Sequence, residues 1–245
     1  MRFTIKPEDA DPIIIKDSQY GYSIGWHLMQ EGVDGWFNTP TLREDFEEHP
    51  TMDGSIKPLL MTQRERIVTL TAGYQFNSSV AAADAMDAIN NLFGKELTIT
   101  CEDASGSRSA IGYLSDSPDI TLMNSEDTFI VELIITCPDP HKYSQAITYR
   151  ASNNRITVLN LGNCDTWPVL RASGSVTSLT ATLNGHTISW SGSTSNLVID
   201  FRRGTCSSGT MSVDDAFPIP PGEHVVSITT NSGVSVSMEV KSAWR

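Results

Sequence analysis

The 245-residue sequence is poor in basic side chains. It has 17 Lys and Arg against 29 Asp and Glu, which gives a formal net charge of −12 and a pI of about 4.7. Lys and Arg contacts to phosphate supply most of the affinity of nucleic-acid-binding proteins, and basic patches draw proteins to anionic membranes. The composition therefore argues against specific nucleic-acid binding and against attachment to a membrane surface.

Cysteine and long apolar runs are also scarce. The four cysteines, Cys101, Cys137, Cys164 and Cys206, are too few and too widely spaced for a disulfide framework, so we expect reduced thiols. Residues 1–15 include acidic side chains and a proline where a signal peptide needs an unbroken apolar stretch. No run approaches the roughly 20 apolar residues that cross a bilayer. We therefore expect a protein made in the cytoplasm, without a membrane span.

Motifs for catalysis and cofactor binding are nearly absent. Neither G-x-x-x-x-G-K-[ST] nor G-x-G-x-x-G occurs. The segment GYSIG (21–25) matches the G-x-S-x-G nucleophile pattern at Ser23, but Gly32 and Gly35 interrupt the helix that should follow, which favours a glycine-rich strand. The segment RRGTCSSGT (202–210) has the small residues of an anion loop without a following helix, which favours a turn. We expect no catalytic residue and no cofactor.

Metal ligands and paired carboxylates are equally weak signals. Cys137 and His141 have the spacing of half a zinc site, but no second pair completes it, so a buried cysteine and an exposed histidine are favoured and no metal is expected. Four carboxylates gather in one loop sequence: Glu44, Asp45, Glu47 and Glu48. A solvated acidic surface is favoured there over an acid/base pair, because sequence spacing alone does not fix the separation that glycosidases need.

The net charge is confined to one part of the chain. Residues 1–146 carry 10 basic and 23 acidic side chains, a net of −13, whereas residues 147–245 carry 7 and 6, a net of +1. The second part also holds 28 Ser and Thr among its 99 residues, a composition that suits exposed faces of antiparallel sheets. We therefore expect two domains, 1–140 and 141–245, with the boundary inside 138–145.

The first domain is expected to be mainly β with one helix. Apolar residues recur once with helical spacing: Ala82, Met86, Ile89 and Phe93. Ser78 or Ser79 would cap this helix and Gly94 would end it. Alternating apolar residues predict strands over five segments: 13–15, 66–76, 97–102, 109–114 and 128–137. In the second of these, Val68, Leu70 and Ala72 would share the buried face. A β-sandwich carrying one helix is the expected fold.

The second domain is expected to be an all-β sandwich, because short strands follow one another between turn signals. Asn184-Gly185 is the strongest hairpin signal, since a type I′ turn needs positive φ at both positions. Trp167 and Trp190 are expected in the core. Exposed tryptophans would instead favour a sugar-binding platform, and Trp244, near the end of the chain, is less easily explained as core.

Four features of the sequence occur in a characteristic order. A long irregular passage containing MDG (52–54) leads into the strand RERIVTLTAGY (64–74). The helix AAADAMDAINNLFG (81–94) precedes a strand pair, and a long apolar strand runs into CPDPHKYS (137–144). The second domain contributes three segments: LGNCDTWPVLRASG (161–174), FPIPPGEHVVSI (217–228) and SAWR (242–245). In this order the chain resembles the distal tail proteins of long-tailed, siphovirus-type bacteriophages and related prophages.

The resemblance implies a structural role in a phage virion, without catalysis. The N-terminal domain would be a β-sandwich with one helix, similar to tail-tube proteins, that assembles into a ring, usually a hexamer. The C-terminal domain would be a galectin-like β-sandwich outside the ring. The implied partners are the tail tube protein, a tail-tip hub or tail-associated protein and a receptor-binding protein, all at the tail tip or baseplate. The alternative is a carbohydrate-binding, adhesin-like module that uses the C-terminal sandwich for host recognition.

Two hypotheses follow for the first domain. Its acidity would line a DNA conduit and keep the passing genome from sticking, because like charges repel. The polar passage 36–61 is too long for an ordinary connection, and such loops are often functional. It would reach a neighbouring subunit with five apolar side chains: Trp36, Phe37, Leu42, Phe46 and Met52. The alternative is a mobile surface loop.

Overall fold

The computed structural model describes residues 1–17, 24–43, 48–56, 60–123 and 127–245. These ranges contain 18 strands and one α-helix, so the protein is mainly β, as the sequence predicts. The chain divides into two compact units, Met1–Lys142 together with Arg245, and Tyr143–Trp244. Within the described part of the chain, no helix has both the length and the apolar character required to cross a membrane.

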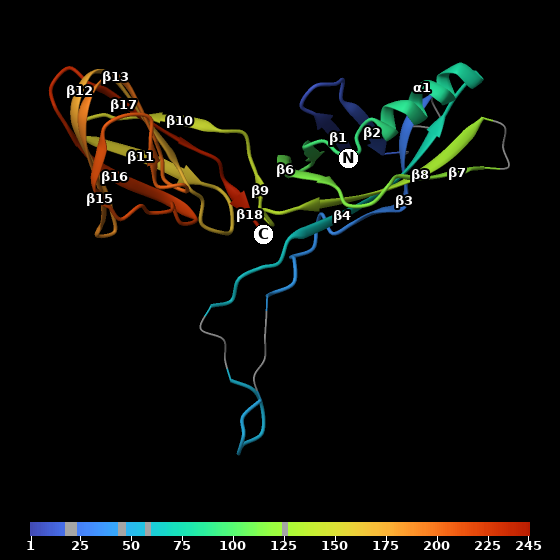
Figure 1. Ribbon diagram of the computed structural model, residues 1–245, viewed down its shortest axis with the longest axis horizontal. Coiled ribbons are helices and arrows are strands. Elements are labelled where there is room, and N and C mark those ends of the chain that lie inside the picture. The colour runs from blue at the N-terminus through green and yellow to red at the C-terminus, as the bar shows by residue number, and fades with distance from the viewer. Residues whose placement is uncertain (18–23, 44–47, 57–59, 124–126) are drawn as a thin grey trace. The chain divides into compact units, whose positions relative to one another are not determined.

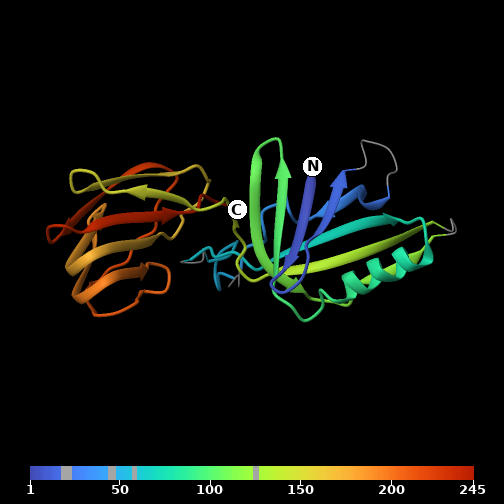
Figure 2. The same ribbon diagram turned by 90° about the horizontal axis from the view of Figure 1, so that it is seen from above.

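Seven strands of the first unit form a closed barrel (Figures 1 and 2). Eight strands of this unit have the following bounds: β1 (Arg2–Pro7), β2 (Ile13–Asp17), β3 (Gly25–Asp34), β4 (Arg66–Gln75), β5 (Leu97–Asp103), β6 (Gly106–Leu114), β7 (Asp119–Leu122) and β8 (Thr128–Cys137). The hydrogen-bonded order is β6-β5-β1-β2-β3-β4-β8, and β6 also pairs with β8. β2 and β3 run parallel, and β7 lies beside β8.

The barrel corrects the expected N-terminal sandwich. Alternation along each strand shows which residues are buried, but it does not show whether the two ends of a sheet meet. Here they meet because β8 pairs with β4 over its whole length and with β6 near its end, through Tyr113↔Thr136 and Leu114↔Ile135. In an open sheet β6 and β8 would each have a free edge. Their pairing closes the barrel and removes both free edges along the paired residues.

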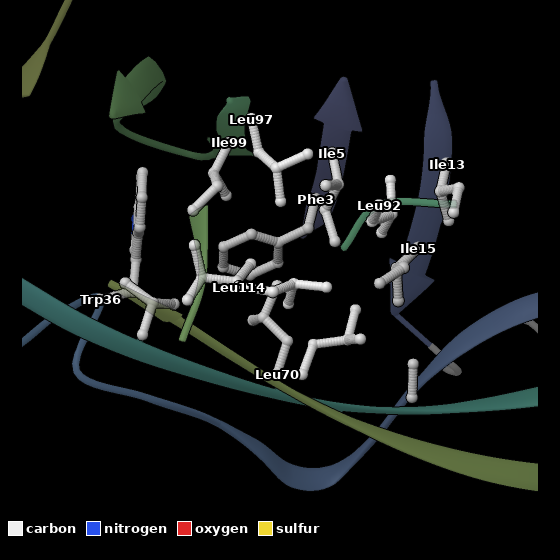
Figure 3. Close-up of a cluster of buried hydrophobic side chains, with 14 of the residues drawn as sticks. Phe3, Ile5, Ile13, Ile15, Trp36, Leu70, Leu92, Leu97, Ile99 and Leu114 are labelled. Carbon is white, nitrogen blue, oxygen red and sulfur yellow. The ribbon is translucent and has the colours of Figure 1, made fainter. Parts of the chain in front are cut away.

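The barrel encloses a dry apolar core, seen in the close-up of Figure 3, where side chains from facing strands point toward one another. Val68, Leu70 and Ala72 of β4 are each 0% exposed, which confirms the face predicted from alternation. Phe3 of β1 and Leu114 of β6 lie in the same cluster.

Helix α1 (Ser79–Asn90) begins as predicted. The Ser78 hydroxyl caps it by accepting a hydrogen bond from the Ala81 N–H at 3.2 Å. Ala82 and Ala85 pack against Phe129 of β8. The expected position of Phe93 on the helix is wrong. The helix ends at Asn90, three residues before Phe93, and the Phe93 side chain is exposed.

The second unit is a sheet that folds over on itself and nearly closes. Its strands are β10 (Ile147–Arg150), β11 (Arg155–Asn160), β12 (Val169–Leu183), β13 (His186–Asp200), β14 (Thr205–Cys206), β15 (Thr210–Asp214), β16 (Gly222–Thr230) and β17 (Ser235–Val240). Two further two-residue strands, β9 (Lys142–Tyr143) and β18 (Ala243–Trp244), are not part of this sheet; β9 continues the first sheet beside β6, and β18 lies next to β9. The long strand β12 pairs with β17 along its first part and with β16 along its last part. The β12–β13 hairpin therefore belongs to both sides of the folded sheet.

The β12–β13 hairpin turns where the sequence predicts, since Asn184 and Gly185 have φ of 52° and 89°. Trp190 is buried as expected, and its Nε1–H donates to the Ser208 carbonyl at 2.6 Å. The expected burial of Trp167 is wrong. Thr166 pairs with Ile219 and is buried, so the next side chain in the extended chain points outward.

The barrel core predicts a sharp contrast between two positions on β4. Leu70→Ala leaves a cavity among residues that are fully buried, so we expect the free energy of unfolding to fall by about 2–5 kcal/mol. Ile67→Ala, on the exposed face of the same strand, is the control and should cost less than about 1 kcal/mol. Urea unfolding followed by circular dichroism measures both. Equal losses would contradict the described core.

Candidate functional site

The connection between β3 and β4 forms an arm, defined here as residues 37–65. Its two sides approach each other through isolated bridges, Leu42↔Gln63 near the barrel and Glu48↔Ser55 near the tip. The Arg43 N–H donates to the Thr62 carbonyl at 2.7 Å. Figure 1 shows the arm extending away from the strands of the barrel. The passage that lacks periodicity in the sequence is therefore a long two-sided projection.

The arm carries a set of exposed apolar side chains. Its described parts present six: Phe37, Leu42, Met52, Ile56, Leu60 and Met61. Leu60 is 77% exposed and Met52 66%. Clustered exposed apolar side chains on a soluble protein mark an interaction surface, whereas single ones need no explanation. This arrangement suits contact with another protein better than it suits chemistry on a small molecule.

The predicted interface residues fall into three groups. Phe37, Leu42 and Met52 are exposed on the arm, and Phe46 lies outside the described residues. Trp36 is 2% exposed and lies in the barrel core, edge-on to Phe3 with ring centroids 5.6 Å apart. Its side chain therefore offers no surface to a neighbour, which corrects that expectation.

Gly35 explains why Trp36 turns inward. It adopts φ of +75°, and a Cβ there would lie 1.8 Å from the Ile67 carbonyl oxygen. Only glycine permits both the left-handed turn and this close approach. Sequence reasoning also missed Ile56, Leu60 and Met61, which follow the acidic stretch of the arm; their scattered spacing matches neither the helical nor the strand period.

The root of the arm is held by a buried arginine. Arg66, the first residue of β4, is 1% exposed. Its guanidinium donates four hydrogen bonds to backbone carbonyls: Nη1 to Gly35 (2.6 Å), Trp36 (3.3 Å) and Asn38 (2.7 Å), and Nε to Pro140 (2.8 Å). Arg66 thereby ties the start of the arm, its end and the segment that follows β8 to one another.

A second cation reinforces the same point. Lys142 is 4% exposed, and its Nζ donates to the Trp36 carbonyl at 2.8 Å while lying 5.8 Å from the centroid of the Trp36 ring. Burial, together with the neighbouring positive charges of Arg66 and Arg108, lowers the pKa of Lys142 to about 8. Burial also lowers the pKa of Arg66. The hydrogen bonds of both cations go to backbone carbonyls and not to a carboxylate.

The predicted half zinc site is not a metal centre in this geometry. Cys137 is 0% exposed, and burial raises the pKa of its thiol to about 11, with Arg66 acting in the opposite direction. His141 Nδ1 instead lies 2.9 Å from Asp139 Oδ1. Among the described residues, no group of three or more His, Cys, Asp and Glu side chains is placed to hold a metal ion.

Ser23, Glu44, Asp45 and Glu47 lie outside the described residues. The segment 202–210 joins β13 to β15, and its Gly209 packs so closely on Trp190 that a Cβ would lie 2.6 Å from the indole. That glycine is explained by packing on a core tryptophan. All four cysteines are free thiols. Cys101 and Cys164 are buried like Cys137, and Cys206 is half-buried. Burial raises the pKa of the Cys101 thiol to about 11.

No protein-family model matches the sequence, and the curated proteins hold no match either. Solved structures match over 98–99% of the chain at 10–15% identity, and they show its fold, which is similar to that of proteins from a phage hub adsorption apparatus and a phage baseplate. The match with the Dit (distal tail) protein of phage SPP1 has a TM-score of 0.71 and 15% sequence identity and covers 99% of both chains. That protein is described as a paradigm of the hub adsorption apparatus in phages that infect Gram-positive bacteria.

Two structures of the phage p2 baseplate in its activated conformation also match. The Sr form gives a TM-score of 0.55 at 10% identity over 98% of each chain, and the Ca form gives 0.53 at 10% identity over 99% of this chain and 98% of that one. The resemblance to distal tail proteins that the sequence suggests is thus confirmed at the level of the fold.

Removing the buried guanidinium should loosen the root of the arm. Arg66→Met removes the guanidinium donor from four carbonyls, of which only that of Trp36 keeps Lys142 as a donor, so we expect the free energy of unfolding to fall by about 3 kcal/mol, and amide exchange at 35–38 to accelerate. The control is Arg64→Met, an exposed arginine two residues away. If both variants lose the same stability, the carbonyl cluster contributes nothing specific.

Lys142 should give the protein a distinctive dependence on pH. Its pKa is about 8 in the folded state against 10.5 for an ordinary lysine, so between these values the unfolded chain binds a proton that the folded one releases. The free energy of unfolding should therefore rise with pH across this window, by about 3 kcal/mol at most, relative to Lys142→Met.

Urea unfolding of both proteins at pH 7.5, 8.5 and 9.5 measures this effect. The comparison with the variant is needed because the raised thiol pKa values of Cys101 and Cys137 act with the opposite sign above pH 9. Parallel curves for the two proteins would show that Lys142 is not buried as described.

Proposed function

We propose that this protein is the distal tail hub of a long-tailed phage or prophage. Copies of the chain associate into a ring, a hexamer, which joins the tail tube to the baseplate and host-recognition proteins and lets DNA pass. The observation that carries this proposal is a fold match that spans both units, over 99% of this chain and 99% of the SPP1 hub protein. A match confined to one unit would support only a shared domain.

The arm supports association of like subunits. A projection with exposed apolar side chains on one side of a subunit, received by a different surface of the next, makes a head-to-tail contact, and such contacts close into rings when the rotation permits. Phe37, Leu42 and Met52 stay in the proposed contact, and Leu60 and Met61 join them. The buried cations at the root would hold the arm in a fixed direction in the free subunit, which lowers the entropic cost of docking.

The charge of the first unit supports a conduit role. The first 146 residues carry a net of −13, so a ring of such domains would repel the phosphates of passing DNA. The tail tube protein and a tail-tip hub or tail-associated protein are the proposed neighbours of this ring. The proposed hub makes no contact with a membrane and no specific contact with nucleic acid.

The second unit would lie outside the ring as a galectin-like sandwich and offer attachment to a receptor-binding protein. This proposal places the protein at the tail tip of the virion, after synthesis in the host cytoplasm. A sugar platform built on Trp190 loses its basis, because that indole is buried and already donates to a carbonyl. His186, which could have joined such a platform, lies 3.1 Å from the carboxylate of Asp215.

The proposal predicts a ring that depends on the arm. Native mass spectrometry and light scattering should give a particle several times the 26.8 kDa chain mass. Replacing two exposed arm residues, in Met52→Ser with Leu60→Ser, should shift the population toward monomer, because the exposed apolar contact is lost.

Val225→Ser is the matched control, since it removes an exposed apolar side chain from β16 in the second unit and should leave the ring intact. An intact ring after deletion of residues 40–56 would rule out the arm as the contact. A monomer for the unchanged protein at tens of micromolar would contradict the hub proposal itself.

A further inference from the structure

The second unit has a hollow of about 520 Å³ on the outer face of its β10-β17-β12-β13 layer. The strand register sets the side chains around it in rows. Arg150, Ser237, Arg171 and Val198 are successive partners across the four strands, and Ser235, Ser173 and Asn196 form the next row. Residues two apart along a strand share a face, so both rows face the same side.

The two arginines of the first row are in different states. Arg171 is fixed, since its Nε donates to Glu239 Oε1 at 2.7 Å and its Nη2 to Oε2 at 3.2 Å. Arg150 makes no side-chain hydrogen bond or ion pair with the described residues, and it also lines an adjoining hollow of about 730 Å³ together with Arg155. The two strands that carry Arg150 and Arg171 have one strand between them, so their backbones are about 10 Å apart.

The local charge is opposite to that of the chain. Neither hollow is lined by a carboxylate, and Glu239 is the carboxylate that offsets Arg171. Three guanidinium groups therefore line the two hollows, in a protein with a formal net charge of −12, and the two carboxylates in the neighbouring row of this face, Glu239 and Asp200, each lie within ion-pair distance of an arginine. Guanidinium groups bind phosphate and carboxylate through paired N–H donors, so the surface is complementary to an anion.

The remaining lining indicates what else the ligand carries. The hydroxyls of Thr148, Ser173, Ser235 and Ser237 and the amide of Asn196 surround the arginines of the first hollow. These groups both donate and accept hydrogen bonds, which suits ligand hydroxyls. The first hollow has no aromatic lining residue, whereas protein contacts usually centre on large apolar or aromatic anchors, so this lining favours a ligand held by charge and hydrogen bonds over a protein segment.

We propose that this face, the arginine face, binds an anionic, hydroxyl-rich ligand: a sugar or polyol that carries a phosphate or carboxylate. Arg150 receives the anionic group, Arg171 is held beside it by Glu239, and the serine, threonine and asparagine side chains bind the hydroxyls. The site is separate from the buried Trp190 and from the arm. It goes beyond the proposed hub function and does not depend on ring formation.

Saturation-transfer NMR on the full-length protein tests the site with four probes: glucose 1-phosphate, glucuronate, glucose and inorganic phosphate. We expect the two charged sugars to bind with dissociation constants in the millimolar range at low salt, about tenfold or more tighter than glucose, and to weaken as salt is added. Glucose 1-phosphate should also bind more tightly than inorganic phosphate, because it alone engages the hydroxyl groups.

Arg150→Ala should weaken the binding of both charged sugars by about tenfold or more, because a charge-assisted hydrogen bond is lost. Arg150 has no structural partner, so circular dichroism and light scattering should be unchanged. The control is Arg203→Ala, an exposed arginine of the same unit that pairs with Asp200, and it should bind as the unchanged protein does.

Four outcomes would overturn the proposal. These are no binding of a charged sugar at 10 mM, equal binding of glucose and the charged sugars, an equal loss in Arg203→Ala, and inorganic phosphate binding as tightly as glucose 1-phosphate. A hexaglutamate peptide that binds more tightly than the sugars and depends on Arg150 would assign the arginine face to an acidic protein segment instead. Because light scattering reports the oligomer separately, failure here leaves the ring test standing.

Discussion

Two cations buried without a carboxylate determine how the first unit is arranged. Charge is expensive to bury without compensating hydrogen bonds, and here the carbonyls of residues 35, 36, 38 and 140 accept those of Arg66 and Lys142, while Nη2 of Arg66 has no hydrogen-bond partner among the described residues. These carbonyls must lie around the two cations. The end of β3, the start of β4 and the segment after β8 therefore lie next to one another. Trp36 is drawn into the core by the same convergence. A flexible-looking polar passage thus has a rigid root.

The parts of the fold that alternation controls were predictable from sequence. Val68, Leu70 and Ala72 share a buried face, and Asn184-Gly185 turns a hairpin, because each depends on neighbours within a few residues. Barrel closure was not predictable, since it depends on β6 meeting β8 from a different part of the chain. The burial of Trp36 was missed for a similar reason: its partners are Phe3 and Lys142, which are distant in sequence.

The two units present different kinds of surface. The first exposes apolar side chains on the arm and carries the acidic excess, which fits association with copies of itself and repulsion of polyanions. The second exposes hydroxyls and unpaired guanidinium groups on a regular sheet face, which fits small polar ligands. On the proposals made above, the charge split along the sequence would also divide assembly from recognition. The arginine face could not be predicted from the sequence, because its rows come from four separate strands.

The buried thiols bear on how long the protein would last outside a cell. Oxidants attack the thiolate rather than the thiol, and they must reach the sulfur. Cys101 and Cys137 are enclosed in the barrel and carry raised pKa values of about 11, and Cys164 is buried as well. Oxidation of the thiols would therefore begin at the half-buried Cys206, whereas the two thiols inside the barrel would be protected.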